Sequence, residues 1–478
     1  MNYSAVSYII GAVIRVEAVL LLAPLLISAI YRESSGWAFL ITACICVVVG
    51  TVFRMFGDKT RKFYAREGFV IVALSWLVMS CLGALPFVIS GQIPNYIDAL
   101  FETISGFTTT GASILSDVES LDHAMLFWRS FTHWIGGMGI LVFMLAVLPS
   151  TGGYNVHLMR AESPGPQVDK LVPRIRQTAV ILYGIYLVMT VFEVIALLLG
   201  GMTLFDAMTT SFATAGTGGF GIYNDSIGGY SAAIQWIVAI FMVLFGVNFN
   251  VYYLLWDRKL HQALRSEEVK VYLAIIALTT AMIVLNTRSL YTSIGTGIRD
   301  AFFQVTSIIT TTGFSTTDFD AWPELSKCVL VILMFIGACA SSTGGGMKVS
   351  RIIIAFKLVA KELRVFVHPR SIKSIRIDGR VVDEDVKTSV GGYFMLYAIL
   401  FALSVLIVSD DNFDFATNFT AVAATINNIG PGLSQVGPTC NFGDFSIVSK
   451  ITLMFDMLAG RLELFPILVL LTPSSWKR

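Results

Sequence analysis

Four short segments of the chain combine threonine or asparagine with a closing glycine. The clearest is Thr108-Thr109-Thr110-Gly111, and Thr310-Thr311-Thr312-Gly313 repeats it. Weaker copies stand at Gly216-Thr217-Gly218-Gly219 and Asn427-Asn428-Ile429-Gly430. Glycine permits backbone dihedrals that can turn carbonyl oxygens toward one side, and rings of such oxygens can replace the hydration shell of a cation. The pattern therefore predicts a narrow cation filter lined by backbone carbonyls and threonine hydroxyls.

The predicted ligands form four layers, and each segment contributes one residue to each layer. The alternative is that Thr-Gly is ordinary turn chemistry in a re-entrant loop that binds no ion. Four copies at matched positions favour the filter. The layers, starting from the glycines, are Gly111, Gly219, Gly313 and Gly430; Thr110, Gly218, Thr312 and Ile429; Thr109, Thr217, Thr311 and Asn428; and Thr108, Gly216, Thr310 and Asn427.

A fixed spacing connects each loop to a short segment before it. An Asp-Ala pair begins at Asp98, Asp206 and Asp300, in each case thirteen residues before the loop glycine, whereas Thr417 holds that place in the fourth copy. Equal spacing predicts an internal repeat. A helix of about ten residues would be roughly 15 Å long, about half of the hydrocarbon core, and would end near the membrane centre. We expect the aspartates to cap these helices, whose carboxyl ends favour a cation.

Composition indicates the environment of these loops. The 478 residues are 55% apolar and 14% charged, whereas soluble domains carry about 25% charged residues. We predict an all-α polytopic membrane protein with four pseudo-repeated helix–pore-helix–loop–helix units around one central pore, preceded by two N-terminal transmembrane helices. The predicted boundaries are 1–57 for the N-terminal helix pair and 68–150, 175–256, 270–357 and 388–472 for the pore repeats.

Each repeat is expected to end in a second span, near 124–149, 230–255, 327–357 and 446–471. The links between repeats are rich in lysine and arginine, which predicts that they face the cytoplasm. Ten spans would then leave both termini in the cytoplasm. Acidic residues gather on the opposite side, where they would raise the local cation concentration. The basic links are 54–66, 157–176, 257–270 and 351–387.

One span contains nine consecutive small residues, at 338–346, which end in Gly344, Gly345 and Gly346. Three glycines in a helix interior cost about 1 kcal/mol each, so the helix should break near mid-membrane. We interpret the break as a movable gating loop beneath the filter. A static kink or a close helix contact explains the same residues.

Two cations near the predicted pore are candidates for gating. Arg461 lies in the last span, where a charge is costly unless it is paired or hydrated. It would repel cations below the filter, or form an ion pair with Glu463 or Asp456. Lys348 could reach the cavity or extend to the cytoplasmic surface.

Together these motifs resemble those of the TrkH/KtrB superfamily of microbial potassium-uptake proteins, and the resemblance covers nearly the whole chain. The two leading spans make it closer to TrkH. The second segment departs from the family pattern, because Ala215-Gly216-Thr217 stands where serine-rich sequence is common. The motifs are Thr-Thr-Thr-Gly-Ala-Ser (108–113), Gly-Gly-Phe (218–220), Thr-Thr-Thr-Gly-Phe-Ser (310–315), Asn-Asn-Ile-Gly-Pro-Gly-Leu (427–433), Ser-Thr-Gly-Gly-Gly-Met-Lys (342–348) and Gly-Arg-Leu-Glu-Leu (460–464).

The resemblance implies potassium uptake across the bacterial cytoplasmic (inner) membrane through a filter with one glycine per repeat. It also implies a homodimer and a cytosolic, TrkA-like nucleotide-binding regulator. The nucleotide is expected on that partner, so the potassium ion is the expected ligand of this chain and no organic cofactor is. We expect no nucleic-acid partner.

Two other functions compete with a channel-like protein. A proton- or sodium-coupled potassium symporter would place carboxylates at broken helices near the membrane centre, whereas the sequence offers carbonyl loops. An intramembrane enzyme would need a nucleophile with its base or a metal cluster. The sequence contains neither His-Glu-x-x-His nor Gly-x-Ser-x-Gly, so we expect the protein not to be an enzyme.

Overall fold

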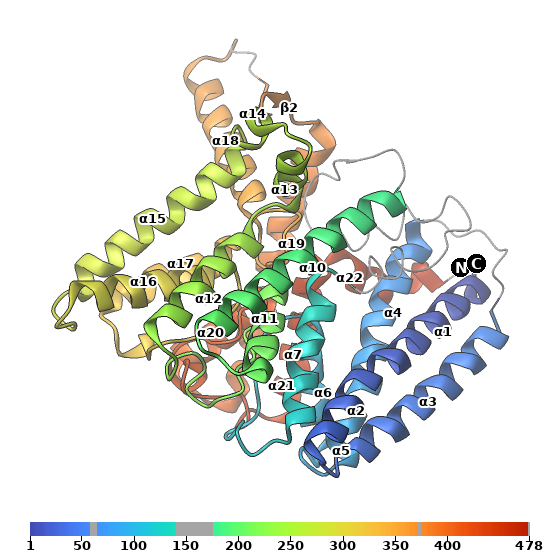
Figure 1. Ribbon diagram of the computed structural model, residues 1–478. Coiled ribbons are helices and arrows are strands. Elements are labelled where there is room, and N and C mark those ends of the chain that lie inside the picture. The colour runs from blue at the N-terminus through green and yellow to red at the C-terminus, as the bar shows by residue number, and fades with distance from the viewer. Residues whose placement is uncertain (58–64, 140–174, 371–373, 477–478) are drawn as a thin grey trace.

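The computed structural model describes residues 1–57, 65–139, 175–370 and 374–476. These residues are mostly helical (Figure 1). In the described part of the chain, strands occur only in a short antiparallel hairpin, β1 (Arg376–Ile377) with β2 (Arg380–Val381). The fold is therefore that of an all-helical membrane protein, as the composition predicts.

An N-terminal helix pair lies beside the rest of the molecule (Figure 1). It consists of α1 (Tyr3–Leu20), continued by α2 (Leu22–Tyr31), and α3 (Gly36–Met55). Gly11 and Gly50 face each other, because an added Cβ on either would lie less than 3.0 Å from the other's carbonyl oxygen. Small residues at such a contact let two apolar helices approach closely. The chain ends next to this pair, where the Tyr3 hydroxyl donates to the Trp476 carbonyl over 2.7 Å.

Four repeats follow, each with a long first helix, a short pore helix, a loop and a return helix. The first repeat has α4 (Ala65–Gly83), α5 (Leu85–Ile89), α6 (Tyr96–Phe107) and α7 (His123–Gly137); the second has α10 (Ile175–Leu199), α11 (Leu204–Gly216), α12 (Ala232–Gly246) and α13 (Phe249–Trp256), then α14 (Leu260–Ala263); the third has α15 (Glu267–Thr287), α16 (Ile294–Ile309), α17 (Glu324–Ile336) and α18 (Val349–Val367); the fourth has α19 (Glu384–Val408), α20 (Phe415–Ile426), α21 (Ile447–Arg461) and α22 (Phe465–Leu471).

The return helices are not the continuous spans that the hydropathy pattern predicts. Within the described ranges, six helices are long and apolar enough to cross a membrane, and none of them is a return helix. The expected span 230–255 bends by 89° between α12 and α13. The spans 327–357 and 446–471 are interrupted after Ile336 and Arg461. The span 124–149 is helical to Gly137, and its part from residue 140 onward lies outside the described residues.

Close packing explains two of these breaks. An added Cβ on Gly136 or Gly460 would lie less than 3.0 Å from the carbonyl oxygens of Phe107 and Ile426, the last residues of α6 and α20. The return helix therefore touches the carboxyl end of its own pore helix at a glycine, and it ends within a few residues. Hydropathy cannot reveal this contact, because it depends on where the pore helix lies in the folded protein.

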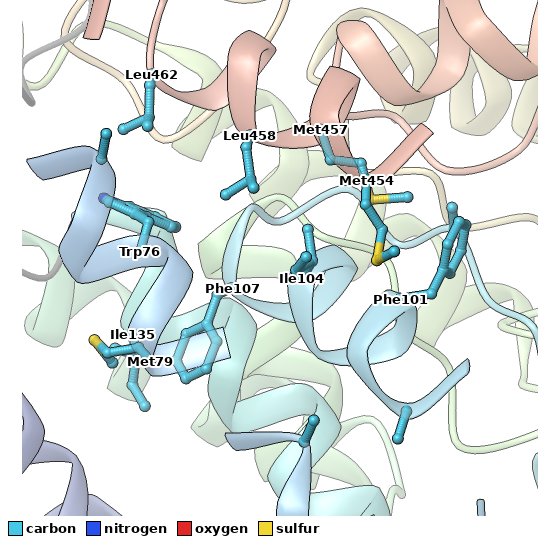
Figure 2. Close-up of a cluster of buried hydrophobic side chains, with 14 of the residues drawn as sticks. Trp76, Met79, Phe101, Ile104, Phe107, Ile135, Met454, Met457, Leu458 and Leu462 are labelled. Atoms are coloured by element: carbon cyan, nitrogen blue, oxygen red, sulfur yellow. The ribbon is translucent and has the colours of Figure 1, made fainter. Parts of the chain in front are cut away.

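The first pore helix is enclosed by protein rather than by lipid. Figure 2 shows Phe101, Ile104 and Phe107 of α6 beside side chains of α4, α7 and α21. Residues three apart lie on one side of a helix, so this spacing buries one apolar face of α6. A short helix on its own is unstable, and this packing fixes its position. The neighbouring side chains that Figure 2 labels are Trp76, Met79, Ile135, Met454, Met457, Leu458 and Leu462.

The expected aspartate caps are wrong. The capping side chains are Asn95, which accepts from the Ile97 amide over 2.9 Å, and Thr203, which accepts from the Asp206 amide over 3.2 Å. The fourth pore helix does have an aspartate cap, Asp414, which accepts from the Thr417 amide over 3.2 Å. Hydrogen bonds from Thr417 lower the pKa of Asp414 from its ordinary value.

Asp98 and Asp206 lie in the first turn of their helices and bond to other elements, whereas Asp300 lies deeper in α16. Asp98 pairs with Lys450 of α21 at 2.7 Å, Asp206 accepts from the Tyr230 hydroxyl over 3.1 Å, and Asp300 pairs with its neighbour Arg299 at 2.9 Å. Only Asp300 lies beyond the first turn, where a carboxylate no longer reaches the free amides. These aspartates instead connect the pore helices to their surroundings or to an adjacent side chain.

We predict that Glu33, in the loop between α2 and α3, stabilises the start of α7. Its carboxylate accepts from the amides of His123 and Ala124 over 2.8 and 3.0 Å. Glu33→Ala should lower the free energy of unfolding by about 1 kcal/mol, as loss of a helix cap does, measured by thermal unfolding in detergent. Asp122→Ala is the matched control, because Asp122 holds the N-cap position of α7 without a side-chain cap bond. Equal effects of the two variants would contradict the assignment.

Candidate functional site

The four pore helices end in the same way. The second residue after α6, α16 and α20, and the first after α11, adopts a left-handed conformation with φ between +55° and +59°; these residues are Thr109, Thr311, Asn428 and Thr217. In each segment the amide of this residue donates to the carbonyl three residues back, and the next amide donates to the carbonyl five residues back. This is the Schellman arrangement, which usually has glycine at the left-handed position. Non-glycine residues there carry backbone strain, and such strain concentrates at functional sites.

This capping leaves one kind of backbone group without a partner. The amides of Thr110, Gly218, Thr312 and Ile429 are bonded to the pore helices. Their carbonyl oxygens accept no hydrogen bond from any group of the described residues, although all four residues are buried. An unpaired buried carbonyl is costly. A cation at this place would satisfy all four.

The four segments close into a ring. An added Cβ on Gly111 would lie less than 3.0 Å from the carbonyl oxygen of Gly218, in the next segment. The same holds for Gly219 with Thr312, for Gly313 with Ile429 and for Gly430 with Thr110. Each glycine therefore leaves room for a carbonyl of its neighbour, and the fourth segment returns to the first. The structure brings together all four predicted glycines, which have φ between +77° and +97°.

Backbone dipoles give this ring a partial negative charge. The carboxyl ends of four pore helices meet there, and each carries a partial negative charge. A cavity of about 170 Å³ lies against the ring and touches all four glycines. Within the described residues, no group of three or more His, Cys, Asp or Glu could hold a metal ion. The arrangement suits a cation that is held weakly enough to leave again.

The side chains behind the ring differ from segment to segment. In the first and third segments the hydroxyls of the threonine pairs 108/110 and 310/312 lie 2.8 Å apart. In the fourth segment, Asn427 donates to the Tyr397 hydroxyl and Asn428 donates to the Thr110 hydroxyl, over 2.8 and 2.9 Å. Asn428 thereby joins the fourth segment to the first.

The predicted gating loop runs from Gly337 to Lys348, between α17 and α18, and it contacts the far end of the filter segments. The Gly345 amide donates to the Thr311 hydroxyl over 2.6 Å, and the Gly346 amide donates to the Asn427 carbonyl over 3.1 Å. An added Cβ on Gly344 would lie less than 3.0 Å from the Thr310 carbonyl oxygen. The interruption is therefore a loop packed against two filter segments, rather than a kink within a helix.

Other bonds hold this loop from the side of the second and third repeats. The Ala340 amide donates to the Glu268 carboxylate over 2.7 Å, and the Cys339 amide donates to the Gly246 carbonyl over 3.1 Å. Lys348 is buried, and its ammonium group donates to the Gly344 carbonyl within the loop. The structure thus excludes extension of Lys348 to the cytoplasmic surface and gives it a place inside the loop.

Arg461 bridges three elements beside this loop. It donates to the carbonyls of Gly136 and Gly137 over 2.5 and 2.6 Å, and to the Thr343 carbonyl over 2.9 Å. The two carboxylates expected as its partners have others: Glu463 pairs with Arg351 at 2.5 Å, and Asp456 accepts from Ser404 over 2.7 Å. Arg461 therefore connects the end of the fourth return helix with the end of the first and with the gating loop.

Known proteins are similar to this chain in sequence and in structure. The family model TrkH, described as a cation transport protein, matches residues 35–478. The chain belongs to the TrkH family. Two relatives named Trk system potassium uptake protein TrkH, from Salmonella typhimurium (strain LT2) and Escherichia coli (strain K12), are 40% identical to it, with 100% of each chain covered. The crystal structure of the potassium transporter TrkH from Vibrio parahaemolyticus matches with a TM-score of 0.89 and 36% identity, over 100% of both chains.

Sequence reasoning missed part of this TrkH-family site. Arg129 and Glu102 form a buried ion pair at 2.7 Å behind the first filter segment, and His133 lies behind the second. In the sequence Arg129 is only a charge within the predicted span 124–149. The available signal was the spacing of Arg129 and His133, four residues apart on one return helix, which places both on one side of it. Which filter segment they would face depends on the tertiary structure.

We predict that removing Gly344–Gly346 raises cation flux in this TrkH-family protein. The deletion eliminates the two amide bonds to Thr311 and Asn427, so the loop can no longer stay packed against the filter segments. A several-fold increase in rubidium uptake into liposomes, at equal protein incorporation, is expected. A deletant that folds and conducts as the parent does would contradict a gating role.

The bridge at Arg461 gives a second test of the loop. Arg461→Lys keeps the charge, but a single ammonium group cannot replace the planar fork that reaches three carbonyls. Arg461→Gln keeps a smaller donor and removes the charge. If the bridge restrains the loop, both variants should raise flux several-fold. If only Arg461→Gln does so, the charge matters and the bridge does not.

Proposed function

We propose that this protein takes up potassium ions across the bacterial cytoplasmic membrane through a selectivity filter of backbone carbonyls. The observation that carries the proposal is the closed ring, in which four buried carbonyls approach four glycines of the neighbouring segments and have no donor among the residues that the structure describes. The potassium-uptake names of its full-length relatives support potassium as the cargo. The ligands would be the four layers derived above, from Gly111, Gly219, Gly313 and Gly430 inward.

The geometry supports a cycle of dehydration and release. A cation entering from the cavity beside the glycines would exchange water for the carbonyls of Thr110, Gly218, Thr312 and Ile429. Carbonyl dipoles bind a cation without a fixed opposite charge, so the ion can move on to the next layer. The gating loop, which contains Gly344–Gly346 and Lys348, would lie beyond the last layer. Arg461 holds this loop through the Thr343 carbonyl. Removal of the loop from the path would be the step that opens the protein.

We further propose that a cytosolic, TrkA-like nucleotide-binding subunit controls this step and that the protein is a homodimer with both termini in the cytoplasm. The lysine- and arginine-rich segments support the orientation. Helices α14 and α18 and the hairpin gather at one end of the molecule (Figure 1). Lys357 of α18 pairs there with Glu267, the first residue of α15, at 2.5 Å and donates to the Arg376 carbonyl of the hairpin over 2.7 Å. Because α18 continues directly from the gating loop, a partner bound at this end could move the loop.

The first experiment is flux from the purified protein in liposomes, comparing potassium, rubidium, sodium and lithium. Potassium and rubidium should permeate at least tenfold faster than sodium and lithium, and the flux should persist without a proton or sodium gradient. Flux that requires either gradient would favour the coupled symporter. Equal permeation of all four cations would overturn the filter as a selective device.

We predict that Gly219→Ala abolishes selective uptake, whereas Gly91→Ala does not. Both glycines have φ of +77°, so alanine causes a similar backbone strain at both. Only at Gly219 would the new Cβ collide with a neighbouring carbonyl, that of Thr312, because Gly91 has no atom within 4 Å of an added Cβ. The measurement is growth at low external potassium together with rubidium uptake, at equal protein levels. Similar losses in both variants would show that strain, not the ring, is responsible.

A further inference from the structure

The second filter segment lacks the side chains that brace the first and the third. Where those segments carry threonine pairs with hydroxyls 2.8 Å apart, the second carries Gly216 and Gly218. In the first segment Thr108 also donates to the Ile104 carbonyl over 2.7 Å, and so anchors the filter to its pore helix. Gly216 and Gly218 can make no such bond. This segment must be held in place by residues from elsewhere.

A histidine of the neighbouring repeat occupies the space that these glycines leave. An added Cβ on Gly218 would lie less than 3.0 Å from three atoms of the His133 imidazole. An added Cβ on Gly216 would lie equally close to the His133 backbone. His133 belongs to α7 of the first repeat and is fully buried. The glycines of the second segment thus accommodate an imidazole, which stands where a threonine side chain would otherwise be.

Both ring nitrogens of His133 are used. Nδ1 lies 2.7 Å from the Gly106 carbonyl oxygen, and the Phe220 amide donates to Nε2 over 3.2 Å. A carbonyl only accepts and an amide only donates, so Nδ1 carries the proton and Nε2 accepts. The ring also packs on the Phe220 ring, with centroids 4.3 Å apart. His133 therefore connects the first pore helix to the residue that follows Gly219.

Arg129, one turn earlier on α7, holds the other side of the same stretch. Its guanidinium lies 4.1 Å from the centroid of the Phe220 ring and donates to the Gly221 carbonyl over 3.1 Å. The buried Glu102 of the first pore helix accepts from its Nε over 2.8 Å. Glu102 in turn accepts from the Ser113 hydroxyl and the Ile114 amide, over 3.0 and 3.1 Å. Residues 218–221 are thus held between two polar side chains of the first repeat.

The fourth repeat has no such pair. Gly136 and Gly460 occupy equivalent places, since each meets the last carbonyl of its own pore helix. Counted from these glycines, Met457 corresponds to His133 and Leu453 corresponds to Arg129. The polar clamp accordingly occurs beside the filter segment that has glycine in place of both threonines. The polar pair on α7 and the glycines of the second segment both depart from fourfold symmetry, and the first compensates for the second.

We propose that His133 is a positioning residue for ion selection, which sets the place of the Gly218 and Gly219 carbonyls in the ring by replacing the missing threonines of the second segment. The proposal rests on the proposed function, because it concerns the selectivity of that filter. His133 touches the filter backbone and not the ion. Arg129 and Glu102 complete the clamp on the outer side.

The test is a double-mutant cycle on His133→Ala and Gly218→Thr in the full-length protein, read as the ratio of potassium to sodium flux in liposomes. Gly218→Thr alone should lower the ratio at least tenfold, because the new side chain collides with the imidazole. His133→Ala alone should lower it several-fold, because the segment loses its brace. The double variant should recover at least threefold over Gly218→Thr, since the threonine then fills the vacated space. A double variant no better than Gly218→Thr would overturn the proposal.

A second pair of variants separates hydrogen bonding from packing and does not depend on the glycine. His133→Gln can donate to one carbonyl and accept from one amide, whereas His133→Leu only fills space. His133→Gln should keep a ratio of potassium to sodium flux at least threefold higher than that of His133→Leu. Equal ratios would mean that His133 only packs, which overturns the positioning role. Gly184→Ala in α10, where an added Cβ meets no atom within 4 Å, is the control and should leave the ratio within twofold. A parent protein that does not discriminate would refute the proposed function itself.

Discussion

The structure depends on the need of buried carbonyl oxygens for a positive partner. Four pore helices end inside the protein, and a Schellman cap at each uses the backbone amides that follow. The carbonyls of Thr110, Gly218, Thr312 and Ile429 remain without donors among the described residues. A lipid-facing loop with such groups would be too costly. The loops can lie at this depth only because they face one another, and the same geometry makes the place where they meet attractive to a cation.

Glycine is required at this ring for a steric reason as well as for its dihedral freedom. Each glycine Cα approaches a carbonyl of the next segment so closely that an added Cβ would clash with the carbonyl oxygen. The ring is thus a set of mutual contacts that no single segment could form. The other residues of the segments do not form these contacts, so they can differ. Two segments carry threonine pairs, one carries asparagine and one carries glycine. Each difference is matched by a different support, such as Tyr397 behind Asn427.

The return helices serve the ring by stopping beside it. Gly136 and Gly460 let them touch the ends of the pore helices. The backbone carbonyls at each break can then accept hydrogen bonds from other residues. Arg461 uses the carbonyls of Gly136 and Gly137, and it joins them to the gating loop. A protein with four continuous return helices would offer neither these carbonyls nor space for the loop. The breaks are therefore part of the site, not interruptions of a scaffold.

The amino-acid sequence by itself determined the membrane environment, the four repeats and the four loops, because each depends on local composition or on fixed spacing. Thirteen residues from Asp98, Asp206 and Asp300 to their glycines are visible without coordinates. The roles of those aspartates were not, since Lys450 and Tyr230, the partners of Asp98 and Asp206, lie in parts of the chain that the spacing does not bring together. The ends of α7 and α21 beside their pore helices, and the clamp of Arg129 and His133 on the second segment, likewise depend on contacts between separate parts of the chain. Hydropathy and spacing describe one segment at a time, so only the tertiary structure could decide which segments meet.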